Sequence, residues 1–223
     1  DALMQRTAHR PVASGRISAR SGVIFATVLS VASIVVLWAF TTALAAALAV
    51  VAILAYAVGY TVVLKRRTAQ NIVWGGAAGC MPVLIGWAAV TDSLSWAAVA
   101  LFLIVFFWTP PHYWPLSLRY REDYAAAGVP MLPVLAQPRT VMRHILGYSV
   151  LMIAASLSLI WLAPMGPVYT ITAIVLGIVF LAEVARLWVS VAKGVADPAP
   201  MRLFHGSITY LAVLFLAVGI DPF

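Results

Sequence analysis

The sequence contains few charged residues, few acids and a single cysteine. Charged residues make up 9% of its 223 residues, whereas hydrophobic residues make up 64% and the mean hydropathy is +1.01. Such values exclude a soluble globular domain and indicate an integral membrane protein. The one cysteine, Cys80, excludes a disulfide framework and a cysteine-based metal site, and its apolar surroundings predict a small buried side chain. The net charge of +7 does not call for nucleic acid, because membrane topology and anionic lipid head groups account for it.

Seven apolar runs fill almost the whole sequence. Each is close to the roughly 20 residues that a helix needs to cross a bilayer. None has the alternation that is typical of strands in a membrane barrel. We therefore expect an all-α, polytopic membrane helix bundle that forms a single domain over residues 1–223. The expected spans are at about 22–38, 43–64, 72–91, 96–118, 144–162, 168–192 and 204–220.

The distribution of basic residues predicts how these spans are oriented. If the residues before position 22 are cytoplasmic and the crossings alternate, all fourteen Lys and Arg fall on the cytoplasmic side or in the cytoplasmic half of a helix. The opposite connections, 40–42, 91–95 and 164–167, contain no base. By the positive-inside rule we expect a multi-pass protein of the cell (inner) membrane. Its polar, site-forming loops would be cytoplasmic and its C-terminus would lie outside.

The most informative polar stretch is residues 110–133, PPHYWPLSLRYREDYAAAGVPMLP. Its prolines at 110, 111 and 115 predict a broken backbone at the end of a membrane helix. Such a break is tolerated only where it is buried in protein or lines a wet cavity. Two further polar segments, 1–18 and 60–72, are expected on the same side of the membrane. The sequence thus predicts that basic and acidic groups converge at one end of the bundle.

Basic and acidic groups gathered in this way suit a diphosphate bound together with magnesium. Lys and Arg neutralise phosphate oxygens, and Mg²⁺ accepts one or two carboxylates in addition to phosphate oxygens and water. Asp1 and Asp123 would supply the carboxylates, and the three adjacent bases at 65–67 are candidates to neutralise the phosphates. A diphosphate at the mouth of an apolar cavity implies a lipid tail inside it. This is the arrangement needed to ionise an allylic isoprenoid diphosphate. The faces of aromatic rings can stabilise the carbocation that forms.

Other interpretations of the same residues stay open. The bases at 65–67 also suit a stop-transfer cluster, and residues 119–123 also suit a solvated loop with a local ion pair. His112 is expected either to make a structural hydrogen bond or to contact a substrate.

Two pairs within the apolar runs predict helix packing. Glu183 and Arg186 are three residues apart, so they share one helix face, and we favour a structural ion pair over a functional site. Gly75 and Gly79 have the GxxxG spacing that indicates close helix packing.

Four segments, taken together and in this order, closely resemble the protohaem IX farnesyltransferases, or haem O synthases, of the UbiA superfamily of intramembrane prenyltransferases. The four segments are DALMQRTAHRPVASGRIS, YTVVLKRRTAQNIVWGGAAG, TPPHYWPLSLRYREDYAAAGVPMLPV and LFHGSITYLAVLF. The resemblance implies a bundle of nine helices around a cavity that opens toward the membrane and is capped by cytoplasmic loops. Because the sequence begins at Asp1 without an initiator Met, we expect a fragment that lacks the first two helices.

The resemblance also implies a reaction. The farnesyl group of farnesyl diphosphate would be joined to a vinyl group of haem b, giving haem O and diphosphate for haem–copper oxidase assembly. Haem b is then a substrate rather than a cofactor, and Mg²⁺ accompanies the diphosphate. A haem A synthase or oxidase assembly proteins are candidate partners. The alternatives are a UbiA-type prenyltransferase for an aromatic quinone precursor and, in another class, a transporter or a non-catalytic haem-binding membrane protein.

Site residues follow from the matching motifs. Asp1, as the last member of an NxxxDxxxD motif, Lys65 and Asp123 would be catalytic, and Asp1 and Asp123 would also bind the metal. Arg119 stands where quinone-type relatives would have an acid, which favours the haem branch. The residues expected to bind substrate are Arg6, Arg10, Arg66, Asn71, His112, Arg119, Arg121 and Tyr124.

Overall fold

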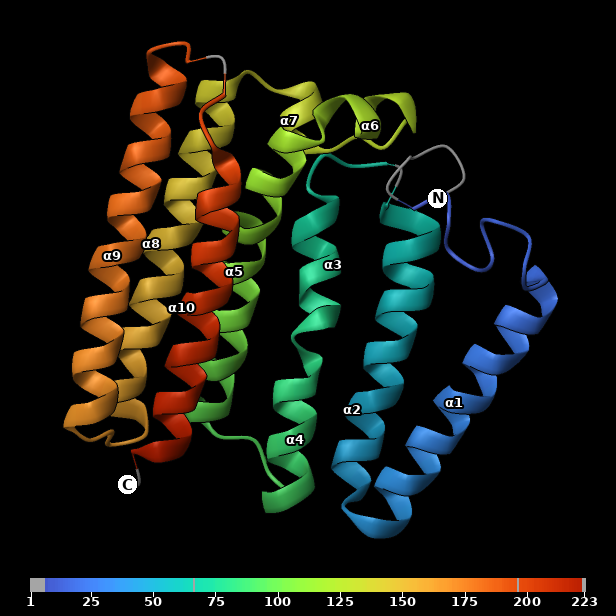
Figure 1. Cartoon of the computed structure of the whole chain (residues 1–223). Coiled ribbons are helices and arrows are strands. Elements are labelled where there is room, and N and C mark those ends of the chain that lie inside the picture. Colours follow the sequence, from blue (N-terminus) through green and yellow to red (C-terminus); the bar gives the residue numbers. More distant parts are fainter. Residues whose placement is uncertain (1–6, 66, 196, 222–223) are drawn as a thin grey trace.

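The computed structural model describes residues 7–65, 67–195 and 197–221, and in these residues it is helical without any strand (Figure 1). The expected all-α fold is therefore confirmed. Its elements are α1 Ala19–Phe40, α2 Ala43–Leu54, the π-helix η1 Ala55–Leu64, α3 Asn71–Gly79, α4 Met81–Thr91, α5 Trp96–Arg119, α6 Arg121–Ala126, α7 Leu132–Leu135, α8 Pro138–Leu162, α9 Pro167–Ala192 and α10 Pro200–Ile220.

Seven helical stretches of the described chain are long and apolar enough to cross a membrane, as the sequence predicts. Four are α1, α5, α9 and α10, and two are composite, α2 with η1 and α3 with α4. The seventh, α8, begins at Pro138 rather than near residue 144. Proline suits the first helical position, so the helix starts ahead of its apolar run and includes two arginines, Arg139 and Arg143.

The predicted backbone break at the prolines is wrong. Helix α5 continues through Pro110, Pro111 and Pro115 to Arg119, and all three prolines are buried. Proline removes a helical hydrogen bond, but neighbouring helices can compensate for that loss inside a membrane bundle. The backbone instead leaves the helix at Tyr120, whose φ of −109° and ψ of 32° are not helical.

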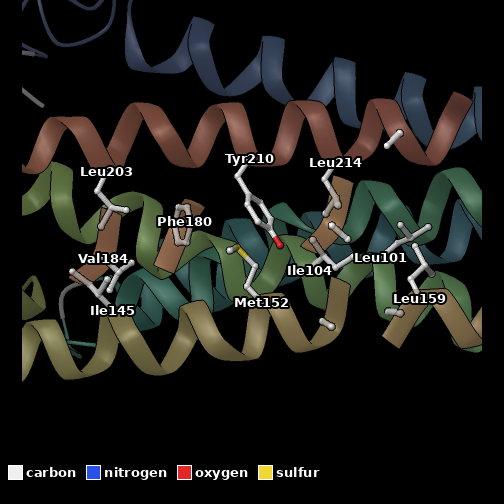
Figure 2. Packing of buried hydrophobic residues seen from close by; sticks show 14 of the residues in the cluster. Leu101, Ile104, Ile145, Met152, Leu159, Phe180, Val184, Leu203, Tyr210 and Leu214 are labelled. Carbon is white, nitrogen blue, oxygen red and sulfur yellow. The ribbon is translucent and has the colours of Figure 1, made fainter. Parts of the chain in front are cut away.

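The core lies among α5, α8, α9 and α10, and Figure 2 shows their side chains meeting. Polar ties reinforce it. The Tyr169 hydroxyl donates to the Ser156 carbonyl at 2.8 Å, and the buried Asp221 accepts at 2.7 Å from the Tyr169 N–H at the start of α9. At the other edge of the bundle, α1 packs against α2 and has no buried residue (Figure 1). Its apolar side chains are suited to face lipid.

The expected ion pair in α9 is confirmed and is larger than predicted. Glu183 accepts from Arg186 at 3.2 Å and also from Arg202 of α10 at 2.7 Å. One carboxylate therefore joins two helices.

Close packing of α3 occurs at Gly75 and Gly76, not at the predicted pair Gly75 and Gly79. A Cβ at Gly75 would lie 2.8 Å from the Tyr60 ring, whereas one at Gly79 would meet nothing within 4 Å. Cys80 is buried as predicted, and its thiol donates to the Gly76 carbonyl at 2.9 Å.

Candidate active site

The predicted polar segments lie at one end of the bundle. Figure 1 shows the end of η1, the start of α3, the end of α5, and α6 and α7 at the end opposite the C-terminus. Lys65, Asn71 and Asp123 therefore share this end. Asp1, Arg6 and Arg66 lie outside the described residues. Arg10 lies in the loop ahead of α1, where it lines a pocket together with other residues of the range 11–25.

Asn71 joins α3 to the loop between α6 and α7. Its side chain is buried, and its Nδ2 donates to the Pro130 carbonyl at 3.2 Å. Its Oδ1 is buried with no hydrogen-bond partner among the described residues, and the same holds for Oε1 of Gln70. A buried, unpaired oxygen is costly, so two adjacent ones indicate acceptors that are set aside for a ligand. The sequence analysis missed Gln70, although it immediately precedes Asn71.

Asp123 and Tyr124 lie on α6. Asp123 is half-buried, as is Lys65 just after η1, and no ion pair joins the two within the described chain. Tyr124 is buried and packs against Met131. Ile72 of α3 packs against the same cluster, so α6 is linked to α3.

An aromatic cavity of about 280 Å³ lies between η1, α3 and α5. The π-helical turn brings Tyr56 and Tyr60 to its wall, with ring centroids 5.4 Å apart, and the three glycines of α3 leave room opposite them. The sequence analysis missed these tyrosines, although their spacing of four residues places them on one helix face. The lining comprises Tyr56, Tyr60, Ile72, Gly75, Gly76, Gly79, Val105, Trp108, Thr109 and Tyr113.

A second cavity, here called the apolar groove, lies between α5 and α10. Its volume is about 450 Å³, and it shares Val105 and Trp108 with the aromatic cavity. The two cavities are therefore neighbours with a common wall. The groove is lined by Val105, Trp108, His112, Phe204, Ile208, Leu211, Ala212 and Phe215.

His112 is held at the wall of the groove. Its ring stacks between Trp108 and Phe204, with centroids 4.2 and 4.5 Å away, and its Nδ1 lies 2.7 Å from the Ser207 hydroxyl. That hydroxyl donates to the Phe204 carbonyl at 2.5 Å, so it accepts from Nδ1–H of His112. The structural hydrogen bond that was one expectation for His112 is present, and substrate contact stays a prediction.

Arg119 and Arg121 share a pocket whose lining includes none of the other predicted site residues. Both line a pocket of about 430 Å³, here called the arginine pocket, which the connection between α9 and α10 completes. Within the described chain neither guanidinium is paired with a carboxylate, so the local ion pair considered for residues 119–123 is not formed. The turn at Tyr120 separates Arg119 from Asp123, because α6 starts in a new direction (Figure 1). The arginine pocket is lined by Leu118, Arg119, Arg121, Pro138, Val191, Gly194, Val195, Asp197, Pro198 and Pro200.

No group of three or more His, Cys, Asp or Glu side chains that could hold a metal ion occurs in the described part of the chain. A divalent ion bound with a diphosphate does not need one, since Mg²⁺ takes few protein carboxylates and keeps water and phosphate oxygens. Asp123 fits that modest requirement.

Comparison with known proteins gives consistent matches along the whole chain. The model of the UbiA prenyltransferase family matches residues 1–219. A "Protoheme IX farnesyltransferase" of Kineococcus radiotolerans is 55% identical over 237 residues, which cover 100% of this chain and 70% of that protein. The proteins of the same name from Leifsonia xyli subsp. xyli and Streptomyces avermitilis are 56% and 51% identical, with 100% of this chain and 72% and 74% of theirs covered. No solved structure matches significantly. With a family match over nearly its full length and seven apolar helices, this multi-pass membrane chain belongs to the UbiA prenyltransferase family.

Proposed function

We propose that the protein transfers the farnesyl group of farnesyl diphosphate to a vinyl group of haem b and so forms haem O and diphosphate. The observation that carries this proposal is the pair of cavities that meet at Val105 and Trp108. The smaller one is lined largely by aromatic rings and glycines, as suits an isoprenoid chain, and the larger one is apolar, as suits a porphyrin. Similarity to proteins named protoheme IX farnesyltransferase, at 51–56% identity in the three cases above, supports this choice of substrates.

The polar end would hold the leaving group. Lys65 would neutralise phosphate oxygens, and the Asp123 carboxylate would hold Mg²⁺, which screens the negative charge of the diphosphate. Asn71 Oδ1 and Gln70 Oε1 are acceptors for water or another donor there. Asp1 as a second carboxylate, together with Arg6, Arg10 and Arg66, completes the proposed diphosphate site.

The aromatic cavity would protect the allylic cation. When the C–O bond breaks, its electron pair leaves with the diphosphate, and the faces of Tyr56, Tyr60 and Trp108 attract the cation. The terminal vinyl carbon then bonds to the farnesyl carbon. Water adds to the resulting cation beside the porphyrin ring and loses a proton, which leaves a hydroxyethyl group.

All bases of the described helices and loops lie toward the polar end, so we place that end in the cytoplasm and the C-terminus outside the cell membrane. Interaction with a haem A synthase or oxidase assembly proteins stays a prediction.

The test is haem O formation, followed by chromatography, with the protein produced in the longest form that its gene encodes. Lys65→Ala and Asp123→Asn should each lower the rate by about 10²-fold or more, because each removes a charge aimed at the leaving group. Lys193→Ala and Glu122→Gln are matched controls, since both residues are exposed at the same end. An unchanged rate in either test variant would remove that residue from the mechanism.

Two measurements separate the alternatives. In a competition between haem b and aromatic acids, farnesylation of the acid would favour the quinone-type enzyme. Diphosphate release in proteoliposomes, dependent on haem b, should accompany product formation. Haem binding without diphosphate release would instead indicate a non-catalytic haem-binding protein.

A further inference from the structure

The apolar groove and the arginine pocket lie in line along one face of α5. Val105, Trp108, His112 and Arg119 follow one another at spacings of three, four and seven residues, which places them on a single helix face. Arg119 is two turns beyond His112, or about 10 Å at 1.5 Å per residue. The stripe that forms one wall of the groove thus ends in a guanidinium group.

Helix α10 repeats this order on the opposite wall. Phe204 lines the groove, and Pro200, one turn earlier, lines the arginine pocket. Figure 1 shows that α10 begins at the end of the bundle where α5 finishes, and that the two helices run side by side. Both walls therefore lead from the groove to the same pocket.

The arginine pocket has the chemistry of a carboxylate site. Each guanidinium can bind one carboxylate through two parallel hydrogen bonds. Neither Arg119 nor Arg121 has a carboxylate partner within the described residues. The acid that lines the pocket, Asp197, instead accepts at 3.0 Å from the backbone N–H of Ala199 just before α10. Two arginines are thus available for two carboxylates of a ligand.

We propose that the arginine pocket binds the two propionate carboxylates of haem b, while the apolar groove holds the body of the porphyrin. This inference rests on the proposed function. Haem b carries both propionates on one edge and its vinyl groups toward the opposite edge. With the propionates at Arg119 and Arg121, the vinyl edge points along the groove toward Trp108 and Val105. That is the wall shared with the aromatic cavity, so the reacting vinyl group faces the farnesyl chain.

This arrangement changes the role of the two arginines. The sequence analysis predicted that they bind substrate, without assigning them to one of the two substrates. In the structure they face the connection between α9 and α10, whereas Lys65 and Asn71 lie beside η1 and α3. We therefore assign the two arginines to haem b, which accepts the farnesyl group, and we assign the diphosphate to the end of the bundle with Lys65 and Asn71.

The experiment compares haem b with its dimethyl ester, in which both propionates are uncharged. Binding is measured by titration of the haem absorption band in vesicles of phosphatidylcholine, so that anionic lipid does not compete. The wild-type protein should bind the ester about tenfold more weakly than the acid. The double variant Arg119→Gln/Arg121→Gln should bind both forms as weakly as the wild type binds the ester. Its KM for farnesyl diphosphate should stay unchanged.

The double variant Arg139→Gln/Arg143→Gln is the matched control. It removes two exposed charges near the same end, and neither residue lines the arginine pocket. It should distinguish acid from ester as the wild type does. Equal binding of acid and ester by the wild type would overturn the proposal. The proposal would also be overturned if the Arg119→Gln/Arg121→Gln variant raised only the KM for farnesyl diphosphate. That result would assign the two arginines to the diphosphate.

The outcome separates this site from the proposed reaction. A wild-type protein that prefers the acid to the ester but forms no haem O would contradict the reaction and support the site. Normal haem O formation with the same KM for haem b in both double variants would support the reaction and contradict the site.

Discussion

Replacing Gly76 by alanine should destabilise the protein, because α3 packs against α5 there without room for a side chain. A Cβ at Gly76 would lie 2.8 Å from Cγ2 and 2.9 Å from Cβ of Thr109. Thr109 is buried, its branched side chain has few rotamers, and its hydroxyl donates to the Val105 carbonyl at 2.9 Å. The helices must therefore move apart, and overpacking of this kind costs about 1–3 kcal/mol.

Gly79 is a matched control on the same helix. A Cβ there meets nothing within 4 Å in the described chain. Both substitutions remove a glycine, which gains ~1 kcal/mol of helix propensity in a helix interior and no more than that at Gly79, the last residue of α3. The difference in stability between the two variants is therefore a lower bound on the cost of the clash. For a chain of this size it corresponds to a Tm that is roughly 2–12 °C lower for Gly76→Ala.

The single cysteine of this sequence provides the assay. Cys80 is buried, so a fluorogenic maleimide should react with its thiol only as the protein unfolds in detergent. The thiol donates to the Gly76 carbonyl, so the Gly76 substitution could change the reactivity of the thiol directly. Thermal melting followed by circular dichroism, which does not depend on the thiol, therefore serves as a second probe. If Gly76→Ala melts at or above the temperature of Gly79→Ala by both probes, the packing argument is wrong.

Two further predictions concern buried charge. Asp221→Ala should lower the Tm measured by thermal melting, because its carboxylate caps α9 by accepting from the Tyr169 N–H. Such a cap contributes about 0.5–2 kcal/mol to stability. An unchanged Tm would contradict this role for the carboxylate. Glu183→Ala should lower Tm more than Arg202→Ala does, because it leaves the charge of Arg186 uncompensated within a membrane span. The Arg202 side chain is 61% exposed, so its ion pair with Glu183 contributes only about 0–1 kcal/mol to stability. Equal losses in the two variants would contradict this.

The membrane-spanning segments could be predicted from the sequence because the bilayer imposes its requirement on each segment locally. Length and apolarity identified the seven spans that the described chain contains. The continuity of α5 could not be predicted in this way. Pro110, Pro111 and Pro115 each disfavour a helix, and only burial among neighbouring helices, which depends on the whole fold, outweighs that preference.

The candidate site was predictable in its residue types more than in its arrangement. Lys65, Asn71 and Asp123 share one end, as expected from alternating spans. The tyrosines of the aromatic cavity share one helix face in the sequence, but the cavity itself depends on the π-helical turn of η1 and on its packing against the glycines of α3. Tyr60 also closes this turn, since its carbonyl accepts from the Lys65 N–H at 2.8 Å. Neither effect leaves a periodic signal.

The turn at Tyr120 has a consequence for the charges on either side of it. Arg119 and Asp123 are four residues apart, so on an unbroken helix they would be neighbours on one face and would pair. Because the backbone leaves the helix at Tyr120, Arg119 instead lines the arginine pocket and Asp123 lies on α6. Both charges stay available for ligands. Under the proposed function, a base for the haem carboxylates and an acid for the metal can then occupy adjacent positions without neutralising each other. A helix that continued through Tyr120 would pair Arg119 with Asp123 and should therefore weaken haem binding and diphosphate release together.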